Sequence, residues 1–222
     1  MHLLLGRALV SMRRIPATGI NTLRGMDKRL QQVKTAEQIV QWAWSSLPSA
    51  NRRLLEAIGA SQWQVVSAPL GAALDDLLCS AGLRGLSAGA IRETDGAFGV
   101  WEPRLRVVLI RAEDPRLEGV DGATREEFLA RVAWHEWGHA LSVVRCEPAD
   151  VARGRELLEL SPQGIRERIR LAGYPVSQYT HEIVAETYAL LMLRRVRGGD
   201  GQPTWLNNEI YRLLIEMTDW TD

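Results

Sequence analysis

The sequence predicts an α+β fold in which long helices accompany a small sheet. Apolar residues recur at the 3.6-residue period of a helix over residues 124–144 and again over 180–197. Between residues 96 and 110, two short apolar runs flank Pro103, a pattern typical of a β-hairpin. Because helical stretches also occupy both ends of the chain, we expect helices to dominate and the sheet to stay small.

The N-terminal part is predicted to be helical after a basic arm. Residues 1–27 are basic and contain breaks at proline and glycine, which indicates a loosely attached arm. Apolar spacing predicts a helix over Asp27–Leu47 and a second over Ser49–Ile58, with Ser49 as its N-cap. We therefore assign residues 1–60 to an arm and helical extension, and residues 61–222 to one larger domain.

The larger domain begins with the strand and hairpin and continues as helices. The residue types predict a strand, then a helix that Gly82 ends, then the hairpin. Proline at a helix start supports two short helices in the second half of the chain. The expected ranges are Gln62–Ala68 (strand), Leu70–Ala81 (helix), Gly96–Ile110 (hairpin), Pro148–Leu160, Pro162–Leu171 and Trp205–Thr218 (helices).

The helix over residues 124–144 carries the pattern H-E-x-x-H. Thr124 and Glu127 have the spacing of a capping box, which predicts that the helix begins there. His135 and His139 lie one turn apart, so both imidazoles can reach one metal ion, whereas Glu136 is placed to take a proton from a water. This is the arrangement of a hydrolytic zinc site. The alternative is a helix with two surface histidines.

A third ligand is expected from the helix over residues 180–197, with Thr180 as its N-cap. Glu182 and Glu186 share one face of this otherwise apolar helix, and buried carboxylates need a partner such as a metal. The alternative is that they pair with Arg194 or other basic residues on an exposed face. His181 is a rival third ligand, although its side chain points about 100° away from Glu182.

The two helices together resemble the gluzincin zinc metallopeptidases. H-E-x-x-H followed by Glu182-Ile183-Val184-Ala185-Glu186 is similar to the small single-domain minigluzincins and to lethal-factor-type toxin peptidases. The ImmA/IrrE peptidases offer a second comparison, but they usually have Asn where this chain has Glu186. The resemblance covers roughly residues 95–195. It implies a zincin-like domain with an edge strand above the zinc, and the second strand of the hairpin has the matching position in the chain.

The resemblance also implies a role for each site residue. His135, His139 and Glu182 would hold Zn²⁺, and Glu136 would be the general base. Glu186 would accept a hydrogen bond from the outer nitrogen of His135. A zinc peptidase usually needs a further donor for the oxyanion, and the toxin peptidases carry a tyrosine shortly before the glutamate helix. Tyr179 is the first candidate here; the alternative is that its ring only packs on the helix start.

Tyr174 is the second candidate for that donor. The function expected from these residues is hydrolysis of peptide bonds in a peptide or protein substrate. Two alternatives remain open: a zinc-binding regulatory or structural protein without turnover, and a helical interaction protein in which the motif is coincidental.

Composition narrows the range of partners and compartments. The formal net charge is +0, so neither nucleic acid nor an anionic membrane is expected as a partner. No apolar run approaches the length of a membrane span, and residues 1–10 make a poor signal peptide. Cys79 and Cys146 show no metal-binding spacing and are expected to be free thiols. These features favour a cytoplasmic protein, and they leave the oligomeric state open.

Overall fold

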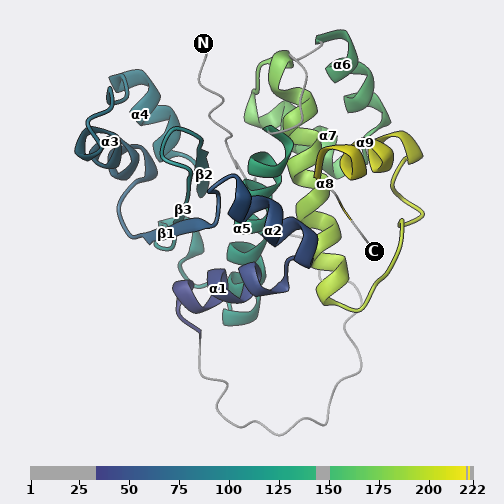
Figure 1. Ribbon diagram of the computed structural model, residues 1–222, viewed down its shortest axis with the longest axis horizontal. Coiled ribbons are helices and arrows are strands. Elements are labelled where there is room, and N and C mark those ends of the chain that lie inside the picture. Colours follow the sequence, from purple (N-terminus) through teal and green to yellow (C-terminus); the bar gives the residue numbers. More distant parts are fainter. Residues whose placement is uncertain (1–33, 144–150, 219, 221–222) are drawn as a thin grey trace, which may run out of the picture.

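A computed structural model describes residues 34–143, 151–218 and 220 and has the mixed α+β architecture predicted above, with helices around a small sheet (Figure 1). Several expectations fall outside the described residues. They are the basic arm over 1–27, the free thiol at Cys146 and the helix start at Pro148. The helix predicted from Asp27 begins instead at Ala36, because Thr35 caps it through a capping box with Gln38.

The sheet contains three strands: β1 (Gln62–Val66), β2 (Gly99–Glu102) and β3 (Val107–Arg111). Their order is β1-β3-β2, with β1 parallel and β2 antiparallel to β3. The predicted hairpin is therefore confirmed as β2 and β3. Its second strand is not an edge strand, however, because β3 pairs with β1 on its other side. The edge of the sheet nearest the H-E-x-x-H helix is β2.

Both faces of β3 are buried, which explains its continuous apolar sequence. Val108 and Ile110 belong to the main hydrophobic core, whereas Val107 and Leu109 pack in a second cluster with helix α3 (Leu70–Ser80). Strand residues alternate between the two faces of a sheet, so both neighbours can be apolar only when both faces are covered. Helix α4 (Ala88–Asp95), which was not predicted, packs against α3 and is capped by Ser87.

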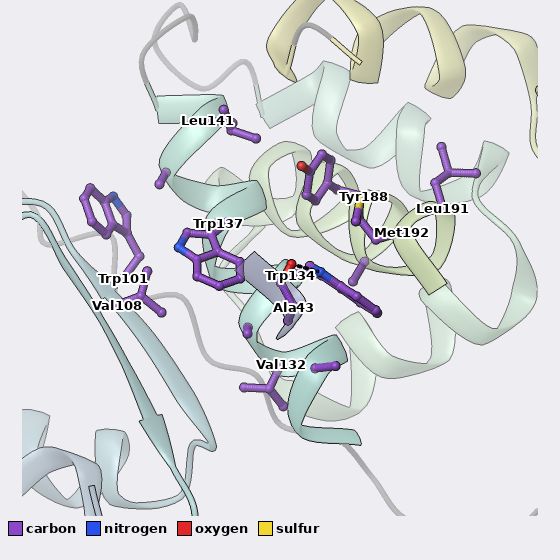
Figure 2. Close-up of a cluster of buried hydrophobic side chains, with 14 of the residues drawn as sticks. Ala43, Trp101, Val108, Val132, Trp134, Trp137, Leu141, Tyr188, Leu191 and Met192 are labelled. Carbon is purple, nitrogen blue, oxygen red and sulfur yellow. Dashed lines mark hydrogen bonds between the residues drawn. The ribbon is translucent and has the colours of Figure 1, made fainter. Parts of the chain in front are cut away.

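Helix α5 (Gly122–Val143) lies at the centre of the molecule, and α1 (Ala36–Ser46) and α2 (Ser49–Ala57) pack against it. The indole nitrogen of Trp134 donates to the carbonyl of Ala43 at 3.0 Å, as the dashed line in Figure 2 shows. Both helices of the region assigned to residues 1–60 thus contribute side chains to the main core.

Three of the predicted helix caps are wrong. Helix α5 begins at Gly122, two residues before Thr124, because Asp121 accepts hydrogen bonds from the backbone nitrogen and the hydroxyl of Thr124, at 3.0 and 2.6 Å. Helix α2 starts at Ser49 itself, preceded by Pro48, and has no side-chain cap. Helix α8 (Tyr179–Val196) starts before Thr180 and also has no side-chain cap, because the short helical turn η2 (Val176–Gln178) leads directly into it.

The second half of the chain is helical and packs on the other side of α5. Helix α8 runs along α5, and this pair has the most extensive contact between elements in the described structure. Four elements of this half pack against α8: α6 (Val151–Leu160), α7 (Gln163–Ala172), η2 and α9 (Asn208–Thr218). The short helical turn η1 (Pro115–Leu117) lies between β3 and α5 in the chain.

Candidate metal centre

The structure brings together His135 and His139 from α5 and Glu182 from α8. The two imidazole Nε2 atoms lie 3.0 Å apart. The Glu182 carboxylate lies 3.6 Å from Nε2 of His135 and 3.4 Å from Nε2 of His139. Ligands about 2.0–2.1 Å from a tetrahedral zinc would lie roughly 3.3 Å from one another. The three side chains therefore have the spacing of a ligand set, and this group could hold a metal ion.

The cluster is buried, and its charges compensate one another. His135, His139 and Glu182 are 3%, 6% and 1% exposed. Burial alone would lower the pKa of His135, but Glu182, whose carboxylate lies 3.6 Å from Nε2, and the charges of Glu186 and Glu136 outweigh burial and raise this pKa to about 9. Burial would raise the pKa of Glu182, but the two histidines lower it to about 2. Glu182 Oε2 also has no hydrogen-bond partner in the described structure, although a buried oxygen normally has one. A bound cation would satisfy it.

Gly138 explains how α5 and α8 come close enough to share a ligand set. A Cβ atom at this position would lie 3.0 Å from Cα of Ala185 and 3.3 Å from Cβ of Tyr188. Those distances are tighter than ordinary contacts, so a side chain at Gly138 would push α8 away. The glycine costs roughly 1 kcal/mol of helix propensity relative to Ala. In return, the helices approach closely where the three ligand residues meet.

Glu136 lies beside the cluster and faces the edge strand of the sheet. Its side chain is fully buried, and Oε2 accepts a hydrogen bond of 2.8 Å from the backbone nitrogen of Trp101 in β2. Burial raises the pKa of Glu136, although the nearby histidines oppose this shift. Its second oxygen, Oε1, has no hydrogen-bond partner among the residues described. One oxygen therefore anchors the side chain, and the other is buried beside Gly99 of β2 without a hydrogen-bond partner in the described structure.

Glu186 lies behind His135 and is surrounded by arginines. Its Oε1 is 3.7 Å from Nδ1 of His135. Its Oε2 is 3.1 Å from Arg131 of α5 and 3.5 Å from Arg168 of α7. Sequence reasoning proposed Arg194 as the alternative partner and missed these two. Arg131 precedes His135 by one helical turn, so its position on the same face of α5 could have identified it. Arg168 lies on another helix, and no local pattern points to it.

The structure places Tyr174, rather than Tyr179, against the cluster. Tyr174 is buried, and burial together with the charges of Glu182, Glu186 and Glu136 raises its pKa well above the usual value. Tyr179 is half-buried and lies against Gly154 of α6. Within residues 34–143 and 151–218, no hydrogen bond or ion pair joins Tyr179 to the three ligand residues. The second candidate for the oxyanion donor thus has the better position.

His181 is also buried but does not belong to the ligand group. Its Nδ1 lies 3.4 Å from the hydroxyl of Ser142, which itself donates to the carbonyl of His139 at 3.0 Å. Burial lowers the pKa of His181. Of the chain neighbours His181 and Glu182, only Glu182 has an atom close to both His135 and His139. The geometry therefore favours Glu182 as the third ligand.

Comparison with known proteins adds no relative. No protein-family model matches the chain, and neither a curated protein nor a solved structure is similar to it. Among the helices that the structure describes, none combines the length and the apolar character needed to cross a membrane.

Proposed function

We propose that the protein is a zinc-dependent endopeptidase whose zincin-like domain, over residues 61–222, is of the gluzincin type. One observation carries the proposal. A buried His-His-Glu group lies beside Glu136, a carboxylate that is not part of the group and has one oxygen without a hydrogen-bond partner. A structural metal site needs ligands only, whereas a hydrolytic site also needs a base.

Zinc fits the residues that are present. Two imidazole nitrogens and one carboxylate oxygen are donors that zinc accepts, and three protein ligands leave a position for water. His135, His139 and Glu182 would hold the ion. When bound in such a site, zinc lowers the pKa of a water and polarises a substrate carbonyl.

The protein's own residues would supply the remaining steps. Glu136 would take the proton of the attacking water, and its raised pKa brings it closer to the working range of a general base. Tyr174 would donate its phenolic proton as a hydrogen bond to the developing oxyanion. Glu186, held by Arg131 and Arg168, would accept from Nδ1 of His135, so that Nε2 of this ring stays unprotonated.

The edge strand supports a peptide as the substrate. Strand β2 pairs with β3 on one side only, and Glu136 is bonded to its other side at Trp101. An extended peptide can add to such an edge through main-chain hydrogen bonds. All four residues of β2 are buried and Trp101 already binds Glu136, so a peptide could pair with this edge only once it is uncovered, and its scissile bond would then lie near the base.

Replacement of the base tests the proposal. Glu136→Gln keeps an oxygen that can accept from Trp101, and Glu136 is not a ligand, so zinc binding and the melting temperature should stay unchanged. Peptidase activity should fall by about 10²–10⁴-fold, as expected for loss of a general base. The measurement is cleavage of a quenched-fluorescence peptide library beside zinc content by atomic absorption. The matched control is Glu118→Gln, an exposed carboxylate in the loop before α5.

A zinc-binding regulatory protein without turnover is the second candidate. The burial of the cluster favours it, because Glu136 has no exposed surface and the three ligands have very little. The same experiment separates the two candidates. If the parent protein copurifies with zinc but cleaves no member of the library, the result would support the zinc-binding regulatory protein without turnover. Parent protein without zinc affinity would contradict both candidates.

A further inference from the structure

A pocket between α7 and α8 lies outside the metal cluster. Its volume is about 490 Å³, and no metal-ligand residue lines it. Its walls come from the two helices and from the segment that follows α8. The side chains that define it are Arg168, Arg194, Arg197, Leu190, Leu193 and Trp205.

The pocket carries an excess of positive charge. Three arginines line it, and no aspartate or glutamate is among the residues of its wall. Arg168 faces Glu186 at 3.5 Å, and Arg197 forms an ion pair with Glu127. Arg194 instead donates to the backbone carbonyl of Gly201 at 2.5 Å, and nowhere in the described chain does it meet a carboxylate. One guanidinium therefore lacks a counter-charge.

The glycine turn after α8 holds Arg194 in position. A Cβ atom at Gly199 would lie 2.6 Å from Cγ and 2.9 Å from Nε of Arg194, so a side chain here would displace the arginine from this position. The backbone nitrogen of Gly199 also donates to the carbonyl of Arg194 at 3.0 Å. Fixing a flexible arginine in advance reduces the entropy lost when it binds a ligand.

The rest of the wall is apolar and partly open to solvent. Leu190 and Leu193 are half-buried, and Trp205 exposes 46% of its surface, unusually much for a tryptophan. A pocket of this volume falls in the range of small-molecule sites, about 300–1,000 Å³. Apolar walls beside one uncompensated guanidinium suit a ligand with an apolar body and a single negative charge, because arginine binds carboxylates through two parallel hydrogen bonds.

We propose that this pocket binds a small monoanion with an apolar body, such as an aromatic carboxylate. The chain's own N-terminal arm is a poor occupant on charge grounds. Residues 1–33 contain six arginines and lysines but only one aspartate. A positively charged segment would be repelled by the guanidinium of Arg194.

Calorimetric titration of the full chain with 2-naphthoate tests the proposal. We expect saturable 1:1 binding of 2-naphthoate and at least about 10-fold weaker binding of the neutral 2-naphthamide. Arg194→Gln should weaken 2-naphthoate by at least about 10-fold and leave the amide unchanged. Trp205→Ala should weaken both ligands. The control is Arg92→Gln on α4, an exposed arginine that is not part of the pocket and should change neither affinity.

Three results would overturn the proposal. They are equal affinity for the acid and the amide, an Arg194→Gln variant that binds as the parent does, and no saturation by 2-naphthoate at any soluble concentration. Thermal melts of each variant would show whether it folds, and the Trp205→Ala series provides an independent readout if Arg194→Gln does not. A capped peptide of alternating Glu and Leu serves as a second probe. Tighter binding of that peptide, lost in Arg194→Gln, would reassign the pocket to a protein partner.

Discussion

Glu182 and Glu186 lie one turn apart on α8, but their surroundings give them different roles. Glu182 contacts both histidine Nε2 atoms, whereas Glu186 contacts only the outer nitrogen of His135 and two arginines. Glu182→Ala should therefore abolish stable zinc binding. Glu186→Ala should weaken zinc binding by about 10–100-fold, the usual range for a residue that orients a ligand. Competition with a chromophoric chelator measures both affinities, and the opposite ranking would exchange the two roles.

Tyr174 and Tyr179 can be separated in the same way. Tyr174→Phe removes a buried hydroxyl whose pKa is raised by the carboxylates of the cluster, whereas Tyr179→Phe removes a hydroxyl on a half-buried ring beside α6. We expect Tyr174→Phe to lower kcat by at least about 10-fold, as loss of an oxyanion donor should, without loss of zinc. Tyr179→Phe should have kcat near the parent value. Steady-state kinetics on one substrate decides between them. A decrease confined to Tyr179→Phe would restore the expectation drawn from the resemblance.

At the scale of elements, the contact between β2 and α5 depends on Gly99. A Cβ atom there would lie 2.7 Å from Val132 and 2.8 Å from both Cγ and Oε1 of Glu136. Gly99→Ala must therefore move the strand or the side chain of Glu136. We expect it to destabilise the protein by about 1–3 kcal/mol, typical of overpacking, and to reduce peptidase activity further than the melting temperature alone explains.

Gly89→Ala is the matched control for that prediction. Gly89 lies in α4, and an added Cβ would meet only the Ser87 hydroxyl at 3.9 Å, an ordinary contact distance. Alanine also favours a helix over glycine by roughly 1 kcal/mol, so this variant should be at least as stable as the parent. Urea denaturation and a peptide assay on both variants would provide the comparison. Parent-like activity in Gly99→Ala would show that the contact with β2 does not position Glu136.

Helices with strong periodicity and the hairpin were predictable, because local apolar spacing determines them. Their starts were less predictable. Thr124 has a capping-box pattern, but Asp121 supplies a better acceptor three residues earlier, so α5 begins there. Helix α4 was missed because the eight residues of Ala88–Asp95 contain little apolar periodicity and are held by packing against α3. The edge position of β2 depends on the long-range pairing of β1 with β3, which no local pattern encodes.

The candidate site shows the same division between local and long-range information. His135, Glu136 and His139 follow from spacing within one helix, and Glu182 follows from the need to compensate a buried carboxylate. Tyr174, by contrast, reaches the cluster only because η2 and α8 fold back toward α5. A residue's distance along the chain from the glutamate helix was therefore a poor guide to its distance from the cluster.

At the scale of the whole molecule, Asp114 links the connection before α5 to the sheet. Hydrogen bonds from the side chain and backbone of Arg116, together with the charge of Arg111, outweigh burial and lower the pKa of Asp114 to about 2. Arg116 also stacks on Phe98, with its guanidinium 4.0 Å from the ring centre. A carboxyl whose pKa is lower in the folded than in the unfolded state stabilises the fold above its unfolded pKa of about 3.9.

This stabilisation should disappear as the pH falls through the folded pKa of about 2. Asp114→Asn should therefore be less stable than the parent at pH 6, and the difference should shrink between about pH 4 and pH 2. Urea titrations at several pH values would measure it. A difference that stayed constant down to pH 2 would mean that Asp114 acts through shape or hydrogen bonding and not through its charge.

The division of the ligand set between α5 and α8 has a consequence for folding. Glu182 follows His139 by 43 positions in the chain, so a metal bound to all three residues in an unfolded chain would have to close a long loop. The entropy lost on closing such a loop rises with its length. In the folded protein the loop is already closed, because α5 and α8 pack together where Gly138 meets Ala185. The affinity for a metal thus depends on how closely α5 and α8 pack against each other. A substitution far from the cluster that separates α5 from α8 by a fraction of an ångström would register first as weakened metal binding, before any change in secondary structure.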